Sequence, residues 1–233
     1  MTDTYLTRIV VLAKAPVAGR SKTRLTPPYA PDQAAAIARA CLQDTLHTVG
    51  KLAASDDAFD TVICLEGDPG SWLPAEIPLI PQCTGEHDAR IAYALEQAVQ
   101  FSGRRAADAV LLVGMDTPQL TQDLLRNAAQ ITRSNDAALA PAHDGGWWLL
   151  GLRRTHAARA RDLVIGVPTS TPHTGALQRR RLRSYGLSVG NLPTLRDIDT
   201  AADIEAVLRD MTRNARRSRF AQLVLSLREA AAA

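Results

Sequence analysis

The sequence predicts an α/β fold built on a mostly parallel sheet. Four short runs of aliphatic or β-branched residues are spaced along the chain, at 9–13, 61–65, 109–113 and 137–140. Each run is apolar throughout, as in strands that are covered on both faces, and a segment long enough for a helix follows each one. Right-handed crossovers between such strands give a mostly parallel sheet with helices packed on it.

The segments between these runs carry helix signals in chain order. Pro31 and Asp32 open an Ala-rich stretch that ends near Val49. The apolar residues of 88–101 fall on one helical face, and another helix is expected at 122–132. The apolar residues of 202–230 also recur at helical spacing, so this segment packs on its own domain or binds a partner subunit. We favour the first alternative, and a homodimer through this segment stays open.

Length and composition predict one domain, 1–233, with a C-terminal helical segment at 202–233. A chain of 233 residues, 46% hydrophobic and 22% charged, can bury a sizeable core without disulfides. Its three cysteines are widely spaced, which argues against a disulfide framework and favours a reducing, cytoplasmic location. No secretory leader and no apolar run of about 18 residues is found, so we expect neither export nor a membrane span.

The net charge of +3 comes partly from two arginine clusters. Aromatic residues make up only 4% of the chain and are not interleaved with these arginines, so stacking platforms for nucleic acid are few. We interpret the clusters as solvated helix faces and expect no nucleic-acid partner. Their members are Arg179, Arg180, Arg181 and Arg183, and Arg213, Arg216, Arg217 and Arg219.

A cationic loop with a glycine follows the first apolar run. Gly19 lets the backbone turn and approach a ligand closely. Lys14, Arg20, Lys22 and Arg24 can neutralise a polyphosphate, the arginines through forked donors and the lysines as point charges. A solvated basic loop is the alternative. We predict that the loop binds the phosphates of a nucleotide.

Aspartates follow the predicted strands at the edge where open α/β sheets bind ligands. Asp116 comes directly after the third run, where its carboxylate can hold Mg²⁺ against phosphate oxygens. Alternatively, Asp116 or Thr117 caps the next helix. Asp197 and Asp199 lie on the same side of an extended segment and can add a second carboxylate to that metal. Asp199 or Thr200 also fits as a helix N-cap.

Two tryptophans follow the turn Asp144-Gly145-Gly146. The glycines permit close backbone approach, and Trp147 and Trp148 provide aromatic surface beside the Asp144 carboxylate, on which a sugar or a base can stack. A Gly-Gly hairpin with tryptophans in the core explains the same residues equally well.

Taken together, these motifs resemble the DUF2064 family of the nucleotide-diphospho-sugar transferase, or GT-A, superfamily. They are A-K-A-P-x-x-G-R-x-K-T-R-L, G-M-D-T-P, P-A-x-D-G-G-W-W-L-L-G-L and D-I-D-T-A-A-D-I, in this order. The resemblance implies a Rossmann-like GT-A three-layer fold with a mostly parallel, mixed central sheet. It also implies a nucleotide over the first loop and a divalent metal, Mg²⁺ or Mn²⁺. Members are commonly described as glycosyltransferases and are similar to phospholactate guanylyltransferases and molybdenum-cofactor nucleotidyltransferases.

Carried over to this chain, the resemblance assigns the metal to Asp116 and the acceptor-side turn to Asp144, Gly145 and Gly146. Asp197 and Asp199 match the late metal-binding acids of the superfamily. The segment 85–90 departs from the usual G-D-L-G-x-R, in a region that lies near the base or substrate in related enzymes. The nucleotide loop matches at Ala13, Lys14, Pro16, Gly19, Lys22, Thr23 and Arg24.

These residues predict a metal-dependent transferase that uses an activated nucleotide and a small-molecule acceptor. In nucleotidyl transfer, which we favour, an acceptor phosphate attacks the α-phosphorus of a nucleoside triphosphate while Lys22, Arg24 and Mg²⁺ stabilise the developing charge. In glycosyl transfer, Asp116 and the metal hold the diphosphate of a nucleotide-sugar, and Asp144 acts as a base on the acceptor hydroxyl. A nucleotide-binding protein without turnover is the third hypothesis.

Overall fold

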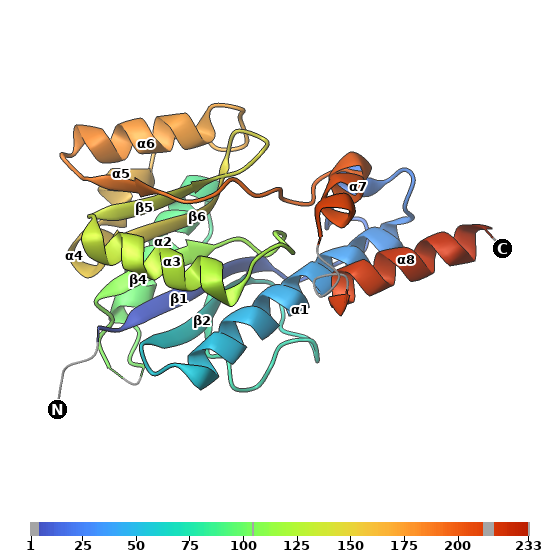
Figure 1. Cartoon of the computed structure of the whole chain (residues 1–233), viewed down its shortest axis with the longest axis horizontal. Coiled ribbons are helices and arrows are strands. Elements are labelled where there is room, and N and C mark those ends of the chain that lie inside the picture. Colours follow the sequence, from blue (N-terminus) through green and yellow to red (C-terminus); the bar gives the residue numbers. More distant parts are fainter. Residues whose placement is uncertain (1–4, 104, 212–216, 233) are drawn as a thin grey trace.

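A seven-stranded sheet with helices on both faces forms the body of the chain (Figure 1). It is seen in a computed structural model that describes residues 5–103, 105–211 and 217–232. The strand order is β3-β2-β1-β4-β6-β5-β7, and only β6 runs antiparallel to its neighbours. The predicted α/β fold with a mixed, mostly parallel sheet is confirmed. The strands are β1 (Thr7–Lys14), β2 (Phe59–Glu66), β3 (Leu79–Pro81), β4 (Ala109–Val113), β5 (Ala137–Pro141), β6 (Trp147–Arg153) and β7 (Val189–Asn191).

Helices cover the two faces of the sheet and enclose a core on each side. On one face pack α2 (His87–Gln100), α4 (Arg154–Ala157), α5 (Ala160–Val164) and α6 (Thr174–Ser184). On the other pack α1 (Pro31–Ser55) and α3 (Gln122–Ser134). β1, β2 and β4 are buried on both faces, which explains why their sequences are apolar runs rather than alternating patterns.

Three strands of the sheet were not predicted. β3 and β7 have three residues each, too few to form a recognisable apolar run. β6 begins at Trp147 and pairs with β5 through the Asp144-Gly145-Gly146 turn. The hairpin of the alternative is therefore present, but only Trp148 is buried in the core, whereas Trp147 is half-buried.

The C-terminal segment folds into α7 (Ala201–Asp210) and α8 (Arg219–Ala232). Both helices pack on the first half of α1, beyond the end of the sheet (Figure 1). We call this third group of buried residues the C-terminal core. It contains Leu25, Ala34, Ile37, Ala40, Cys41, Ile198, Ile204, Val207, Leu208, Met211, Phe220, Ala221 and Val224.

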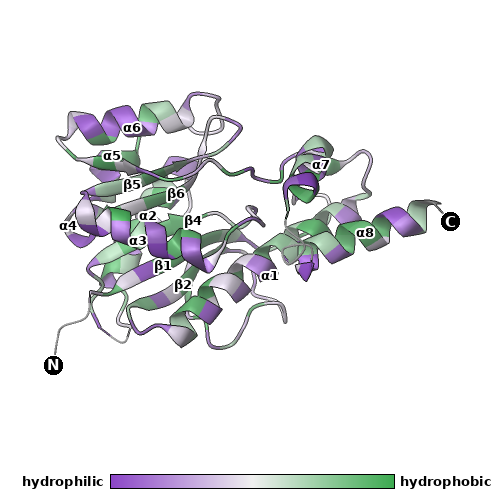
Figure 2. Cartoon of the chain, in the orientation of Figure 1, coloured by the Kyte–Doolittle hydropathy of each residue, from purple (hydrophilic) through white to green (hydrophobic). Residues whose placement is uncertain are grey.

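The first arginine cluster lies on α6, much of which is hydrophilic (Figure 2). Arg180 and Arg183 are exposed, as predicted, whereas Arg181 donates from Nη1 to the carbonyls of Asp162 and Ile165 at 3.2 and 2.9 Å. Arg213 and Arg216 of the second cluster lie outside the described residues. None of the described helices is long and apolar enough to span a membrane, and the three cysteines are unpaired.

Candidate active site

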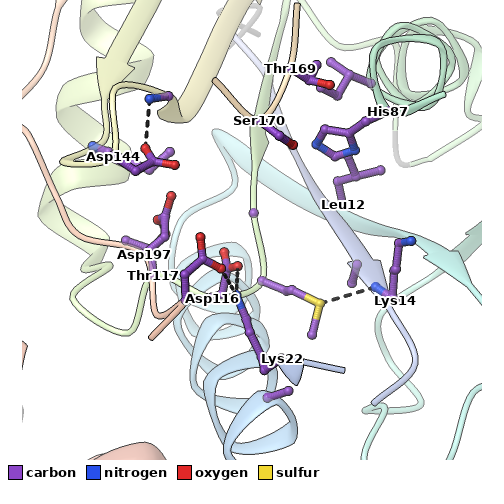
Figure 3. Close-up of a pocket in the computed structure, with 18 of the residues that line it drawn as sticks. Leu12, Lys14, Lys22, His87, Asp116, Thr117, Asp144, Thr169, Ser170 and Asp197 are labelled. Carbon is purple, nitrogen blue, oxygen red and sulfur yellow. Dashed lines mark hydrogen bonds and ion pairs between the residues drawn. The ribbon is translucent and has the colours of Figure 1, made fainter. Parts of the chain in front are cut away.

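A cleft of about 450 Å³ opens at the carboxyl ends of β1 and β4, the edge at which the sequence predicts ligand binding (Figure 3). The segments that line it include the loop after β1, the start of α2, the loop after β4, the β5–β6 turn and the segments 169–174 and 197–199. The lining includes these predicted site residues: Ala13, Lys14, Arg20, Lys22, Thr23, Arg24, Asp116, Asp144, Gly146, Asp197 and Asp199. Pro16, Gly19 and Gly145 are not part of it.

The cationic loop reaches the cleft through a tight turn followed by a short 3₁₀ helix. Gly19 has a φ of 72°, and the amide of Arg20 donates to the carbonyl of Val17 at 3.1 Å, which closes the turn. The 3₁₀ helix η1 (Thr23–Leu25) follows, and Leu25 is fully buried in the C-terminal core. Leu25 therefore anchors the loop while its cations stay at the cleft.

Lys22 joins this loop to two of the predicted aspartates. Its Nζ forms ion pairs with Asp116 Oδ2 and with Asp199 Oδ1, the latter at 3.0 Å. Arg24 Nη2 lies 2.9 Å from the second oxygen of Asp199. Burial lowers the pKa of Lys22, but the charges and hydrogen bonds of Asp116 and Asp199 raise it further, so the net shift is upward. Lys22 is therefore held as a charged ammonium between two carboxylates.

Ile198 brings the late aspartates to the end of β4. Its amide donates to the carbonyl of Asp116 at 2.9 Å, and its side chain is fully buried in the C-terminal core. Asp197 and Asp199 consequently both line the cleft, as the alternation of the segment predicts. The Thr117 hydroxyl donates to Asp197. Burial, together with the charge of Asp116, raises the pKa of Asp197 to about 7.

The capping alternatives have different outcomes for the two aspartate motifs. Neither Asp116 nor Thr117 caps α3, because a turn at 117–120 intervenes and Thr121 is the N-cap, accepting from the Leu124 amide at 3.2 Å. Thr200 caps α7 in a capping box with Asp203. The Asp199 carboxylate therefore does not cap the helix and instead forms ion pairs with Lys22 and Arg24.

The carboxylates provide a donor set for a divalent cation. Within the described part of the chain, no three His, Cys, Asp or Glu side chains are gathered in an arrangement that would hold a metal ion. Asp116 and Asp199 nevertheless direct one oxygen each at a single cation, the Lys22 ammonium. Carboxylate oxygens are the ligands that Mg²⁺ prefers. A divalent cation therefore fits this pair of residues, whereas Asp197 is turned to Thr117.

The β5–β6 turn contributes Asp144 and Gly146 to the cleft. The Gly146 amide donates to Asp144 Oδ1 at 2.8 Å, which orients the carboxylate. Gly145 has a φ of 87°, and a Cβ there would lie 2.0 Å from the carbonyl oxygen of Pro172. The Gly175 amide donates to the Gly145 carbonyl at 2.8 Å. The group that approaches Gly145 closely is thus the Pro172 backbone and not a ligand. His143 is exposed and does not line the cleft.

Several lining residues were missed as candidates for the site. Gln82 donates from Nε2 to the carbonyls of Ala13 and Cys64, at 2.7 and 2.9 Å, so the orientation of its amide is fixed. Since Gln82 directly follows β3, its place at a strand end would have identified it had that strand been recognised.

A second charged group lies on the α2 side of the cleft. Lys14 is 3.0 Å from Glu66 Oε2, which also pairs with Arg90. Partial desolvation, with Arg90 and Lys14 nearby, lowers the pKa of His87, so its imidazole is neutral at pH 7. Arg90 and His87 belong to the segment that departs from the family pattern, which was the only sequence signal for them.

Comparison with a family model confirms the resemblance to DUF2064. The model of DUF2064, described as an uncharacterized protein conserved in bacteria, matches residues 35–171. This range includes Asp116 and Asp144 and begins after the cationic loop. No curated protein matches the chain significantly.

Solved structures share the fold. A candidate nucleotide-diphospho-sugar transferase from Desulfovibrio desulfuricans G20 is 27% identical, with a TM-score of 0.83 over 97% of this chain and 95% of that chain. A Mycobacterium tuberculosis H37Rv protein in complex with manganese is 18% identical, with a TM-score of 0.51 over 88% and 100%. CMP:2-keto-3-deoxy-manno-octonic acid synthetase in complex with CTP is 14% identical, with a TM-score of 0.54 over 87% and 96%. The last two show similarity of fold alone.

Proposed function

Since the chain belongs to the DUF2064 family, whose model matches more than half of it, we propose that it is a metal-dependent transferase acting on an activated nucleotide. The observation that carries this proposal is the convergence of Lys22, Asp116 and Asp199 in the cleft at the ends of β1 and β4. A phosphate-binding cation and metal-binding carboxylates at one point are what a nucleotide phosphate with its metal requires. The manganese and CTP complexes of proteins with the same fold support the same choice of ligands.

Nucleotidyl transfer from a nucleoside triphosphate to a small phosphorylated acceptor is the preferred reaction. Lys14, Arg20, Lys22 and Arg24 line one cleft and together offer enough positive charge for a triphosphate. An acceptor phosphate oxygen attacks the α-phosphorus in line, and pyrophosphate leaves. Lys22 and Arg24 neutralise the charge that develops on the phosphates. A divalent cation held by Asp116 and Asp199 would supply further charge neutralisation there.

Glycosyl transfer from a nucleotide-sugar is the second candidate. It is favoured by the name of the 27% identical relative and by Asp144 and Trp147, which line the cleft together. In this reaction Asp144 takes the proton of an acceptor hydroxyl as that oxygen attacks the anomeric carbon, the bond from this carbon to the phosphate oxygen breaks, and the nucleoside diphosphate leaves. The half-buried ring of Trp147 offers an apolar face for the sugar.

A thermal-shift panel tests the proposal and separates the two reactions. The full chain is heated with Mg²⁺ or Mn²⁺ and either nucleoside triphosphates or UDP- and GDP-sugars, because a ligand that binds only the folded state raises the melting temperature. We expect the largest shift with one triphosphate and loss of that shift in Asp116→Asn. Asp123→Asn is the matched control, because its exposed carboxylate lies outside the cleft.

A preference for nucleotide-sugars would favour glycosyl transfer instead. The proposal would be contradicted if no nucleotide changed the melting temperature in the presence of either Mg²⁺ or Mn²⁺. It would also be contradicted if Asp116→Asn showed the same increase in melting temperature as the wild type. Pyrophosphate release with the preferred triphosphate and a mixture of phosphorylated acceptors then measures turnover.

A further inference from the structure

Lys22 lies at the point on which the two proposed metal ligands converge. Its Nζ pairs with one oxygen of Asp116 and one of Asp199, and only 12% of its side chain is exposed. An ammonium and a divalent cation repel each other strongly at contact distance, so they cannot share the same two oxygens. Lys22 and Arg24 together balance the charges of Asp116 and Asp199, and both of these cations belong to the protein.

We propose that Lys22 and a divalent cation compete for the carboxylates of Asp116 and Asp199. A polyphosphate that binds the Lys22 ammonium then frees these carboxylates for the metal. This inference rests on the proposed function and adds to it an order of events at the site. Metal alone binds weakly because it must displace Lys22. Metal and polyphosphate together bind tightly because the polyphosphate gives Lys22 another partner.

The surroundings of Lys22 allow the exchange without a change of fold. Its long flexible stem can redirect the ammonium while the backbone stays in place. The backbone is held by Leu25, three residues later, which is fully buried in the C-terminal core. Arg20, Thr23 and Arg24 line the same cleft, so phosphates bound by them lie within the region that Lys22 can reach.

Arg24 keeps Asp199 in place during the exchange. Its Nη2 pairs with Asp199 Oδ2, whereas Lys22 pairs with Oδ1. Departure of Lys22 therefore frees one oxygen of Asp199 and one of Asp116 while the Asp199 carboxylate remains oriented. By linkage, polyphosphate must raise the metal affinity by the same factor by which metal raises the polyphosphate affinity.

Removal of Lys22 provides the first test. The chain has only three lysines, Lys14, Lys22 and Lys51, and Lys51 lies exposed on α1 away from the cleft. Binding of Mn²⁺ alone to the full chain is measured by electron paramagnetic resonance for the wild type, Lys22→Met and the matched control Lys51→Met. We expect the dissociation constant of Mn²⁺ to fall at least tenfold in Lys22→Met and to stay unchanged in Lys51→Met. Equal or weaker binding by Lys22→Met overturns the proposal.

A second measurement needs no substitution at Lys22. The wild-type chain is acetylated with an amine-reactive ester at fixed pH, and the rate at each lysine is followed by mass spectrometry. Lys22 should react more slowly than Lys51 in the free chain. Saturating Mn²⁺ should accelerate Lys22 several-fold, because the metal displaces it, and leave Lys51 unchanged. An unaltered rate at Lys22 under saturating Mn²⁺ overturns the exchange.

Asp116→Asn distinguishes failure of this inference from failure of the proposed function. If Asp116→Asn abolishes Mn²⁺ binding while Lys22→Met leaves the affinity unchanged, the metal site stands and the exchange is wrong. If Asp116→Asn binds Mn²⁺ as the wild type does, the metal site of the proposed function is wrong, and the exchange is wrong with it.

Discussion

Arg8 is fully buried, and all five of its guanidinium N–H donors are used inside the protein. Its Nε and Nη2 pair with the two oxygens of Asp60 at 2.9 and 2.6 Å, and Nη1 donates to the carbonyls of Ala98 and Phe101 at 2.8 Å each. These bonds join β1, β2 and the end of α2 at the edge of the sheet opposite the cleft. A single side chain thus ties together three elements that are distant in sequence.

Replacement of Arg8 should be strongly destabilising. Arg8→Met leaves the Asp60 carboxylate, which is 14% exposed, without its partner, and loss of one member of such a pair costs about 3–5 kcal/mol. Urea denaturation of Arg8→Met measures the loss. The control is Arg161→Met, whose pair with Glu96 involves a largely exposed arginine and is expected to contribute under about 1 kcal/mol. Similar values for the two variants would show that the buried pair does not hold the sheet edge.

Individual site residues were predictable where a strand end marks them. Asp116 and the loop cations were found from their place after apolar runs, but their mutual contact was not. Lys22 and Asp116 are 94 residues apart, and each was assigned to a ligand rather than to the other. Opposite charges that the fold brings to one end of the sheet neutralise each other, and no local pattern records that pairing.

Two glycines with positive φ differ in what surrounds them, and this difference is a property of the elements they connect. Gly19 turns the loop after β1, and no atom of the described residues lies within 4 Å of the position that a Cβ would take there. Gly145 in the β5–β6 turn, in contrast, lies against Pro172 before α6. Backbone strain is common to both positions. Only Gly145 adds a steric conflict with a second element.

Alanine substitutions at Gly19 and at Gly145 should therefore differ in how much they destabilise the fold. Gly19→Ala should lose about 1 kcal/mol from backbone strain. Gly145→Ala should lower the free energy of unfolding by at least about 2 kcal/mol more than Gly19→Ala does, because the new methyl group must displace the Pro172 segment. Denaturant unfolding of both variants measures the difference. Equal losses would mean that Pro172 can move away freely.

Asp136 fastens the start of β5 to β7. Its Oδ2 accepts from the amide and the hydroxyl of Ser188 at 2.9 and 2.6 Å, and His156 lies near its other oxygen. The hydrogen bonds from Ser188 lower the pKa of Asp136 below its usual value of 3.8. A carboxyl group whose pKa is lower in the folded state stabilises the fold when it is ionised.

The pH dependence of Asp136→Asn follows from this sign. Above about pH 4, where the unfolded chain is ionised, the variant should be less stable than the wild type by about 1 kcal/mol. As the pH falls through the lowered pKa of the folded state, the wild type gains a proton and the difference should disappear. Denaturation curves from pH 7 to pH 2 measure it, with Asp68→Asn in an exposed loop as the control. If the difference in stability between the wild type and Asp136→Asn persisted at pH 2, ionisation of Asp136 would not be its cause.

Among the elements, length explains only part of what the sequence could predict, because β6 has seven residues and was still not recognised. β1, β2, β4 and β5 have five or more residues and were found from their apolar runs. β3 and β7 are three residues long and depend on neighbouring strands for their pairing. α6 was interpreted only as an arginine face, although Gln178 and Leu182 on it are buried. Such contacts are determined by tertiary packing, which a local pattern does not contain.

At the scale of the whole molecule, the C-terminal core supports both charged segments of the cleft. Leu25 anchors the loop that carries Lys22, and Ile198 anchors the segment that carries Asp199. Both side chains share this core with residues of α7 and α8. Helices that lie beyond the end of the sheet therefore hold the two halves of the site together.

Phe220→Ala tests this coupling. Phe220 is fully buried on α8, and its truncation should cost about 3–5 kcal/mol. Amide hydrogen exchange should rise at 17–29 and 195–200, because their anchor is loosened. Leu163→Ala is the comparison variant, since Leu163 is equally buried but packs on a face of the sheet, away from the C-terminal core. An increase confined to α8 in Phe220→Ala would show that the helices do not support the cleft.

The segments that line the cleft differ in how firmly they are anchored in the core. Leu25 and Ile198 anchor the segments of Lys22 and Asp199 in the C-terminal core, whereas the segment 169–173, which carries Ser170, contributes no residue to any of the three cores. Connections accept replacement during evolution far more readily than core-anchored positions. Relatives with this fold can therefore keep the core-anchored segments of Lys22 and Asp199 while they exchange residues such as Ser170. Under the proposed transferase function, acceptor preference can diverge across the family faster than the chemistry of the reaction.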